Sequence, residues 1–232
     1  MNILNKYRHF SAFMLLGPLC FAQYQFEIKD ASKNYSAVVQ IEDCMDGRCG
    51  GKGTVELFDN KNTKVQTFTS DDLIVYLAEN RKLLSGKMNS LTKEESPIVI
   101  NDFNFDGTED IAIRNGNRGN YNGASYDVYV FNSTQLSFVK SKELTELASN
   151  ALDMFDVDSQ RKRLISYGKS GCCNIFTIEY TVIPNKGLDK VLVKEEDKTE
   201  EDRVKVTIKE KIKDKWVTRK KVYSLEEYNK EK

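Results

Sequence analysis

The chain has 232 residues, with 35 basic and 35 acidic side chains and 40% hydrophobic residues. That length is enough for one substantial hydrophobic core or two small ones. The balanced charge gives no support to nucleic acid or an anionic membrane surface as a partner, because both attract strongly basic chains.

Residues 1–22 read as a secretory signal peptide. Lys6 and Arg8 give a positive start, an apolar stretch runs from Phe10 to Phe21, and Ala22 is the small residue before the expected cleavage. The apolar stretch is too short to cross a bilayer, and no later stretch reaches that length, so we expect no membrane span.

The mature chain, residues 23–232, is expected to form a single β-rich domain. Its calculated balance is 33 basic against 35 acidic residues, because Lys6 and Arg8 leave with the signal peptide. Cys20 follows Leu19 rather than a small residue, so we favour simple cleavage over a lipid anchor. The sequence therefore predicts an exported protein without a lipid anchor.

The mature chain contains no histidine, since His9 lies in the predicted signal peptide. This excludes Ser-His and Cys-His nucleophile pairs, histidine general bases and histidine metal ligands. An enzyme would have to use carboxylate, lysine or metal-bound water chemistry. A binding protein needs none of these groups, so we expect a protein that is not an enzyme.

Four cysteines remain after the signal peptide: Cys44, Cys49, Cys172 and Cys173. An even number in an exported chain indicates two disulfides, for which three pairings exist. A tight Cys44–Cys49 loop would leave a vicinal Cys172–Cys173 bridge, and we prefer this pairing. Cross-bridging between the two regions is the main alternative, while zinc binding is disfavoured because no regular Cys-x-x-Cys pair is present.

Short strand-like segments separated by turns run along most of the chain, which predicts an all-β sandwich, barrel or propeller. Only Glu143 to Met154 has helical periodicity, so we expect one short helix between sheets. The expected strands are Tyr24–Ile28, Tyr35–Ile41, Thr54–Phe58, Lys64–Phe68, Leu73–Leu77, Ile98–Ile100, Ile111–Ile113, Tyr126–Phe131, Arg163–Tyr167 and Phe176–Ile183.

Residues 102–110 have the spacing of a calcium-binding loop. A calcium ion needs six to eight oxygens, which such a loop supplies from positions 1, 3, 5, 7 and 9, with glycine at position 6 for the turn. The plain alternative is a polar turn with scattered acids. The predicted ligands are Asp102, Asn104, Asp106, the carbonyl of Thr108, and Asp110.

An EF-hand is the wrong comparison for this loop, because its position 12, normally a bidentate glutamate, is Ile113 here. The flanking residues are β-branched and strand-like. We therefore predict a calcium loop that joins two strands, with Asp110 or a residue from elsewhere completing the coordination.

The segment from Arg114 to Tyr126 is rich in glycine and asparagine and reads as a projecting loop. We predict that calcium bound at its base fixes its shape, which would lower the entropy cost of binding a partner. Tyr121 is expected to be more exposed than Tyr126 or Tyr129. An ordinary long hairpin connection is the alternative.

The last part of the chain is highly charged. Residues 194–203 read as a solvated loop. After it, the hydrophobic residues from Val204 onward predict an edge hairpin that turns near Lys213–Lys215, and its many lysines would protect the sheet edge from pairing.

Several segments match one known family. They are the run Asp102–Phe131, then Phe155–Asp158, Lys162–Leu164 and Lys169–Cys173, and, before these, Cys44–Cys49 with Gly50–Val55. Together they resemble the exported, calcium-binding, propeller-like immunity proteins that inhibit lysozyme-like peptidoglycan hydrolases of bacterial type IV secretion systems. The likeness covers residues 36–195 and is strongest over 102–131; Ala124 departs from it, where a proline is common.

The resemblance implies a periplasmic inhibitor with a propeller-like arrangement of short antiparallel sheets, one calcium loop and one short helix. Its protein partner would be a lysozyme-like hydrolase, whose catalytic cleft the loops would plug. A tyrosine suits such a cleft, because its ring fills a sugar-sized slot and its hydroxyl can hydrogen-bond a catalytic carboxyl. The residues expected to contact this partner are Asn115, Asn117, Asn120, Tyr121, Ser125 and Tyr126, with Gly119 and Gly123 allowing close backbone approach.

Two other classes of function are compatible with the sequence. A calcium-stabilised propeller scaffold or adhesion module at the cell envelope would repeat the Asp-rich motif, which here is echoed only by Asp156–Asp158. A glycosidase would need two acids facing each other across a cleft, for which Asp127, Asp156 and Asp158 are available.

Overall fold

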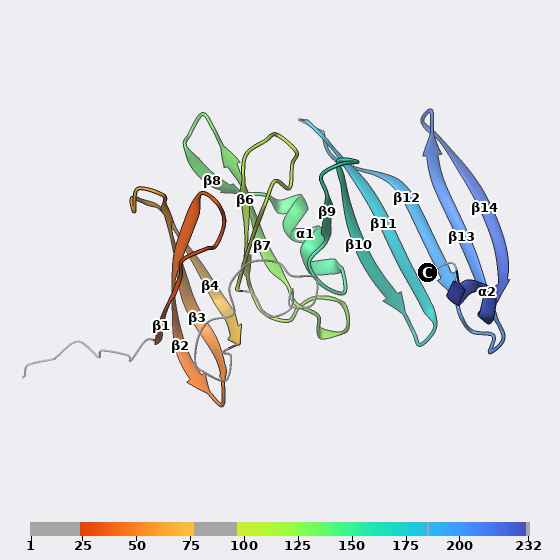
Figure 1. Cartoon of the computed structure of the whole chain (residues 1–232), viewed down its shortest axis with the longest axis horizontal. Helices are drawn as coiled ribbons and strands as arrows, with labels where there is room; N and C mark the ends of the chain where they lie inside the picture. The colour runs from red at the N-terminus through yellow and green to blue at the C-terminus, as the bar shows by residue number, and fades with distance from the viewer. Residues whose placement is uncertain (1–23, 77–96, 185, 231–232) are drawn as a thin grey trace, which may run out of the picture.

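The computed structural model describes residues 24–76, 97–184 and 186–230. These residues form three antiparallel sheets, which lie side by side in chain order (Figure 1). The described residues are thus mainly β, as expected, with two short helices. The three ladders are open and do not join into a closed ring among the described residues, so the propeller-like arrangement stays a prediction.

The first sheet has the order β1-β2-β3-β4, so each strand pairs with its neighbour in the chain. Alternate residues of β2 and β3, including Val39, Ile41 and Val55, are fully buried on the side that faces the second sheet. The strands are β1 (Tyr24–Ile28), β2 (Tyr35–Met45), β3 (Arg48–Asp59) and β4 (Lys64–Tyr76).

The second sheet has the order β5-β6-β7-β8, and its strands are β5 (Ile98–Asn101), β6 (Asp110–Arg114), β7 (Tyr126–Asn132) and β8 (Ser137–Lys140). Helix α1 (Lys142–Asn150) follows β8 and packs against β7. It begins at Ser141, whose hydroxyl accepts a hydrogen bond from the backbone N–H of Leu144 at 3.3 Å.

The third sheet has the order β14-β13-β12-β11-β10-β9 and extends away from the second one (Figure 1). The short helix α2 (Leu225–Lys230) packs on its last two strands. The strands are β9 (Asp156–Asp158), β10 (Arg163–Ser170), β11 (Asn174–Ile183), β12 (Gly187–Asp197), β13 (Arg203–Ile212) and β14 (Lys215–Ser224).

The second sheet is covered on both faces. Ile98, Ile111 and Ile113 pack in a core shared with the first sheet. Ala112 and Val128 point the other way, into a core shared with α1 and the third sheet. Strand β6 is consequently buried at all five positions, including its two charged ends.

Several elements differ from the expectations. Residues 64–76 form the single strand β4 rather than two strands, and β8, β9, β12 and α2 were not predicted. The helix was expected from Glu143 to Met154 but ends at Asn150. The predicted signal peptide and Leu77 lie outside the described residues.

The C-terminal hairpin is confirmed, with β13 and β14 joined by Lys213 and Asp214, both at positive φ. The loop expected over residues 194–203 is wrong in its first part, because β12 continues to Asp197. Glu196 is buried there and forms a hydrogen bond with the hydroxyl of Tyr228 from α2. Burial, followed by the contact with Glu196, raises the pKa of Tyr228.

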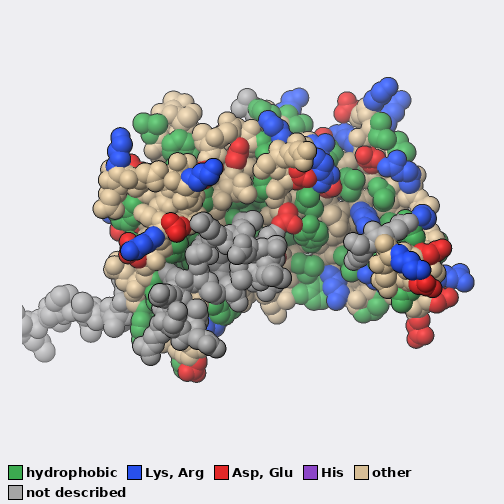
Figure 2. Space-filling view, viewed as in Figure 1, with side chains coloured by type: hydrophobic (Ala, Val, Ile, Leu, Met, Phe, Trp, Pro, Cys, Tyr) green, Lys and Arg blue, Asp and Glu red, His purple; other side chains and the backbone are tan. Residues whose placement is uncertain are grey.

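The face drawn in Figure 2 carries basic and acidic side chains interspersed over its described surface. This distribution matches the balanced composition and does not form a broad basic surface on that face. Among the described residues, no helix is long and apolar enough to cross a membrane.

Both disulfides follow the preferred pairing. Cys44 and Cys49 are cross-strand partners of β2 and β3, and their bridge closes the β2–β3 turn. Cys172 and Cys173 form a vicinal bridge in the exposed turn between β10 and β11.

The first prediction concerns these bridges. The purified mature protein, denatured without reductant, should contain no free thiol in a titration with a thiol reagent. Loss of the Cys44–Cys49 bridge should lower the free energy of unfolding by about 2 kcal/mol, because so short a loop removes little entropy from the unfolded chain. More than trace thiol in the denatured, unreduced protein would contradict the prediction that both bridges are formed.

Candidate functional site

The loop between β5 and β6 brings the predicted calcium ligands together. The backbone N–H of Asp106 donates to Asp102 Oδ1 at 3.1 Å and to Asn104 Oδ1 at 2.9 Å. Asp102 Oδ2 accepts from the N–H of Gly107 at 2.9 Å. Gly107 has a φ of +92°, which lets the chain fold back over these oxygens.

Asp110 anchors the end of this loop in the protein interior. Its Oδ2 accepts from the N–H of Phe103 at 2.8 Å, and its Oδ1 accepts from the N–H of Phe131, at the end of β7, at 2.9 Å. Burial raises the pKa of Asp110 to about 7; the hydrogen bonds from Phe131 and Phe103 oppose this shift, and repulsion from Asp106 and Asp102 adds to it.

The remaining loop side chains have different partners. Burial acts to raise the pKa of Asp106, but hydrogen bonds from Thr108 and Asn104 outweigh it and lower the pKa. Glu109 turns away from the loop centre, where its Oε2 accepts from Ser32 Oγ at 2.9 Å and from Asn34 Nδ2 at 3.0 Å.

This donor set fits a hard cation in its chemistry. Asp110 lies close enough to Asp106 and Asp102 for their negative charges to help raise its pKa. A calcium ion would neutralise them and takes carboxylate, amide and carbonyl oxygens. In the described part of the chain, no three acidic, cysteine or histidine side chains are clustered tightly enough to form a metal centre by themselves.

The glycine-rich loop lies at the other end of β6. This strand starts at Asp110 and ends at Arg114, so the two loops are separated by about 14 Å of extended chain. Figure 1 shows the connections on opposite ends of the second sheet. The prediction that calcium binds at the base of this loop is therefore wrong.

The loop is held instead by its own backbone and by its neighbours. The N–H of Gly119 donates to the carbonyl of Gly123 at 3.0 Å, and the N–H of Asn120 donates to the carbonyl of Ala151 at 2.8 Å. A side chain at Gly123 would collide with the carbonyl oxygen of Leu152, which lies 1.8 Å from an ideal Cβ. The loop thus packs tightly against the segment after α1.

Tyr121 is at the exposed tip of this loop. Its side chain is 58% exposed, and its φ of +55° is unusual for a tyrosine. Its hydroxyl donates to the carbonyl of Gly171 at 3.3 Å, and the ammonium of Lys169 lies 5.7 Å from the ring centre. The expected exposure of Tyr121 relative to Tyr126 is confirmed.

The other predicted contact residues divide into two groups. Asn117 and Asn120 are exposed beside Tyr121. Ser125 and Tyr126 are fully buried, and Asn115 is buried and donates from Nδ2 to Asp127 Oδ1 at 2.6 Å. These three cannot reach a partner in this conformation, so that part of the prediction is corrected.

A polar hollow of about 520 Å³ lies beside Tyr121. Arg114 lines it, with its Nε donating to the carbonyl of Gly116 at 3.0 Å and its guanidinium 5.6 Å from the ring centre of Tyr126. Neither a role for Arg114 nor this hollow was predicted from the sequence. Its other lining residues include Tyr76, Asn117, Asn120, Asn122, Ala124 and Leu152.

The acids considered for a glycosidase are each engaged elsewhere. Asp127 pairs with Lys140 at 2.7 Å, Asp156 accepts from the hydroxyl of Tyr167 at 2.9 Å, and Asp158 pairs with Arg161 at 2.6 Å. Hydrogen bonds from Arg161 lower the pKa of Asp158, which is the opposite of what a catalytic acid requires.

One solved structure has a similar fold, that of a Xanthomonas type IV secretion system related protein. The TM-score is 0.62 and the sequences are 22% identical, with 83% of this chain and 92% of that chain covered. At this identity the likeness supports the fold alone. No protein-family model matches the chain, and the comparison with curated proteins gives no match.

The second prediction tests the calcium loop. Asp106→Ala should lose calcium in elemental analysis of the dialysed protein, and chelation should lower the melting temperature of the wild type but not of this variant. Glu109→Gln is the matched control, because its side chain faces Ser32 and Asn34 rather than the loop centre. Calcium content that is unchanged in Asp106→Ala would refute the ligand assignment.

The third prediction tests the packing of the glycine-rich loop between β6 and β7, which carries Tyr121 at its tip and is called the tip loop from here on. Gly123→Ala should lower the free energy of unfolding by about 1–3 kcal/mol, because the new methyl group would overlap the carbonyl of Leu152. Gly168→Ala should have little effect, since its Cβ would meet Phe176 at an ordinary 3.8 Å. Equal thermal unfolding of the two variants would contradict this packing.

Proposed function

We propose that this protein is an exported, non-enzymatic inhibitor of a lysozyme-like peptidoglycan hydrolase, located in the periplasm, and that the tip at Tyr121 enters the catalytic cleft. The observation that carries the proposal is an exposed tyrosine on a loop fixed by backbone hydrogen bonds and by close packing on Leu152. A preformed loop loses little conformational entropy on binding, so its aromatic tip can act as an anchor.

Three further observations support the proposal. The mature chain has no histidine, and the acids considered for catalysis are engaged in separate contacts. Two disulfides suit an oxidising compartment outside the cytoplasm. The fold resembles that of a type IV secretion system related protein, which supports an association with such a system.

Calcium has a stabilising role in this proposal. Asp102, Asn104, Asp106, Asp110 and the carbonyl of Thr108 would hold one Ca²⁺ at the β5–β6 connection. The ion would offset the repulsion that Asp102 and Asp106 exert on Asp110, whose hydrogen bond from Phe131 ties β6 to the end of β7. It would thereby stabilise the central sheet that carries the tip loop, without touching the loop itself.

A direct assay separates the proposed function from its alternatives. Purified protein is added to peptidoglycan alone and to peptidoglycan with each of several lysozyme-like hydrolases, and the loss of turbidity is followed. We expect no lysis by the protein alone and stoichiometric suppression of at least one hydrolase. Lysis by the protein alone would show that it is an enzyme. No effect on any hydrolase would favour the alternative function, a scaffold or adhesion module at the cell envelope.

The fourth prediction concerns Tyr121 in that assay. Tyr121→Ala should weaken inhibition by about thirtyfold or more, corresponding to about 2 kcal/mol, while the melting temperature stays close to that of the wild type. Trp216→Ala is the control, because Trp216 is also an exposed aromatic residue but lies on the distant strand β14. A folded Tyr121→Ala protein that inhibits fully would remove Tyr121 from the interface.

A further inference from the structure

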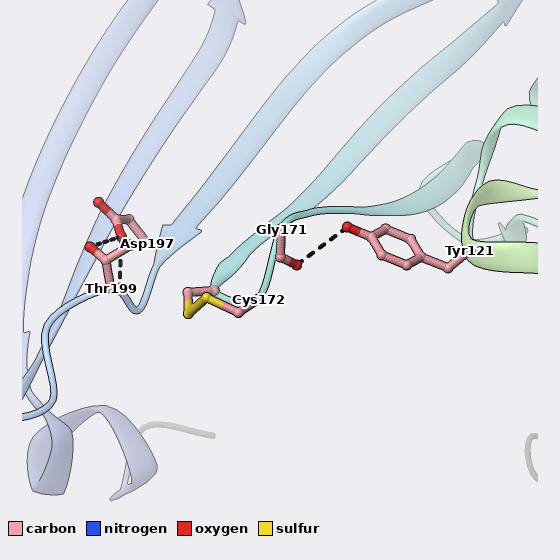
Figure 3. The surroundings of a disulfide bond; sticks show 6 residues. Tyr121, Gly171, Cys172, Asp197 and Thr199 are labelled. Atoms are coloured by element: carbon pink, nitrogen blue, oxygen red, sulfur yellow. Dashed lines mark hydrogen bonds between the residues drawn. A yellow bond between two sulfur atoms is a disulfide. The ribbon is translucent and has the colours of Figure 1, made fainter.

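The exposed turn between β10 and β11 contains the vicinal bridge and contacts the tip loop. Gly171, with a φ of +63°, precedes Cys172 and Cys173, whose sulfur atoms are joined (Figure 3). A bridge between adjacent residues closes only a small ring, so it removes very little entropy from the unfolded chain. Its effect must therefore be local, on the shape of the turn.

Carbonyl groups of this turn and of the end of β10 accept hydrogen bonds from two other loops. Lys169 O accepts from Asn120 Nδ2 at 3.3 Å, and Gly171 O accepts from the hydroxyl of Tyr121 at 3.3 Å. On the other side, Cys173 O accepts from the backbone N–H of Lys198 at 3.0 Å. Figure 3 shows the turn lying between Tyr121 and the segment of Asp197 and Thr199.

Tyr121 depends on this turn for its orientation. The side chain is mostly exposed, so packing restricts it weakly, and its backbone conformation is one that tyrosine rarely adopts. The contacts that orient it come from the carbonyl of Gly171 in the turn and from the ammonium of Lys169 at the end of β10. Movement of Gly171 would therefore move or release the aromatic tip.

We propose that the Cys172–Cys173 bridge is a positioning element for Tyr121, and that opening the bridge releases the tip and weakens partner binding. This deepens the proposed function and rests on it for the binding step, whereas the positioning step concerns this chain alone. A dithiol opens the bridge by supplying two electrons and two protons: the bond between the sulfurs breaks, two thiols form, and the dithiol becomes a cyclic disulfide.

The test uses the double variant Cys44→Ala/Cys49→Ala, in which the vicinal bridge is the only disulfide left in the mature chain. The ring resonances of Tyr121 are recorded by NMR before and after dithiothreitol, with the ring resonances of the buried Tyr126 as an internal reference. We expect the Tyr121 ring signals to move toward the positions of a freely rotating tyrosine on reduction, with the Tyr126 signals unchanged and reoxidation restoring the original positions. Unchanged Tyr121 signals would overturn the positioning role, whether or not any hydrolase is inhibited.

A second measurement separates positioning from general loosening of the structure. Inhibition constants are compared for the wild type, Tyr121→Phe, Cys172→Ser/Cys173→Ser and their combination, with thermal unfolding of each. If the bridge acts through the Tyr121 hydroxyl, the serine pair should weaken inhibition about tenfold in the wild type but less than threefold in the Tyr121→Phe background. Equal losses in both backgrounds would overturn the proposed route through Gly171.

If no hydrolase responds to the wild type, the proposed function fails while the NMR experiment still decides the positioning role. The same NMR measurement on Cys172→Ser/Cys173→Ser without reductant guards against side effects of dithiothreitol. Displaced Tyr121 ring signals in that variant, with a melting temperature near that of the wild type, are the expected result. Tyr121 signals at the wild-type positions would overturn the proposal.

Discussion

The burial of strand β6 on both faces is the constraint on which the rest of the structure depends. Ile111 and Ile113 face the core shared with the first sheet, while Ala112 faces the core shared with α1 and the third sheet. Burial of an isoleucine side chain contributes about 1.5–3 kcal/mol. A shift of β6 by one residue in its pairing would move every side chain of the strand to the opposite face of the sheet. The register of β6 is therefore firmly set, and its two end residues have fixed positions.

Each end of β6 carries a buried charged residue whose side chain is hydrogen-bonded to backbone groups. Asp110 accepts hydrogen bonds from Phe103 and Phe131, whereas Arg114 donates to Gly116 and stacks near Tyr126. The candidate calcium loop and the tip loop are therefore linked by a rigid strand and do not touch each other. Under the proposed function, a bound ion would contribute to stability without shaping the tip, which contacts Leu152 and the turn at Gly171.

The sequence predicted those features that depend on local pattern. Alternating hydrophobic residues located most strands, and the spacing from Asp102 to Asp110 located the turn with converging oxygens. Glycine and asparagine around Tyr121 correctly indicated an exposed tip. The Cys44–Cys49 pairing was preferred because these residues can close a tight loop. The hairpin of β2 and β3 does place them opposite each other.

Features that depend on contacts between distant segments could not be predicted in this way. Strand β12 was missed because its polar residues suggested solvent, although Glu196 is buried by Tyr228 from a helix far along the chain. Ser125 looked like a rim residue, but its hydroxyl accepts a hydrogen bond from the backbone of Arg118 inside the loop. The predicted calcium loop does not lie at the base of the tip loop, because the five-residue strand β6 separates the two loops.

The central claim is that the tip loop and the turn beside it form the surface that binds a lysozyme-like hydrolase. The most direct measurement is a hydrogen-exchange footprint of the protein, free and bound to a hydrolase that it inhibits. The account predicts new protection over residues 117–123 and 169–173, with the β13–β14 hairpin unchanged. Protection confined to that hairpin, or to the first sheet, with an unaltered tip would contradict it.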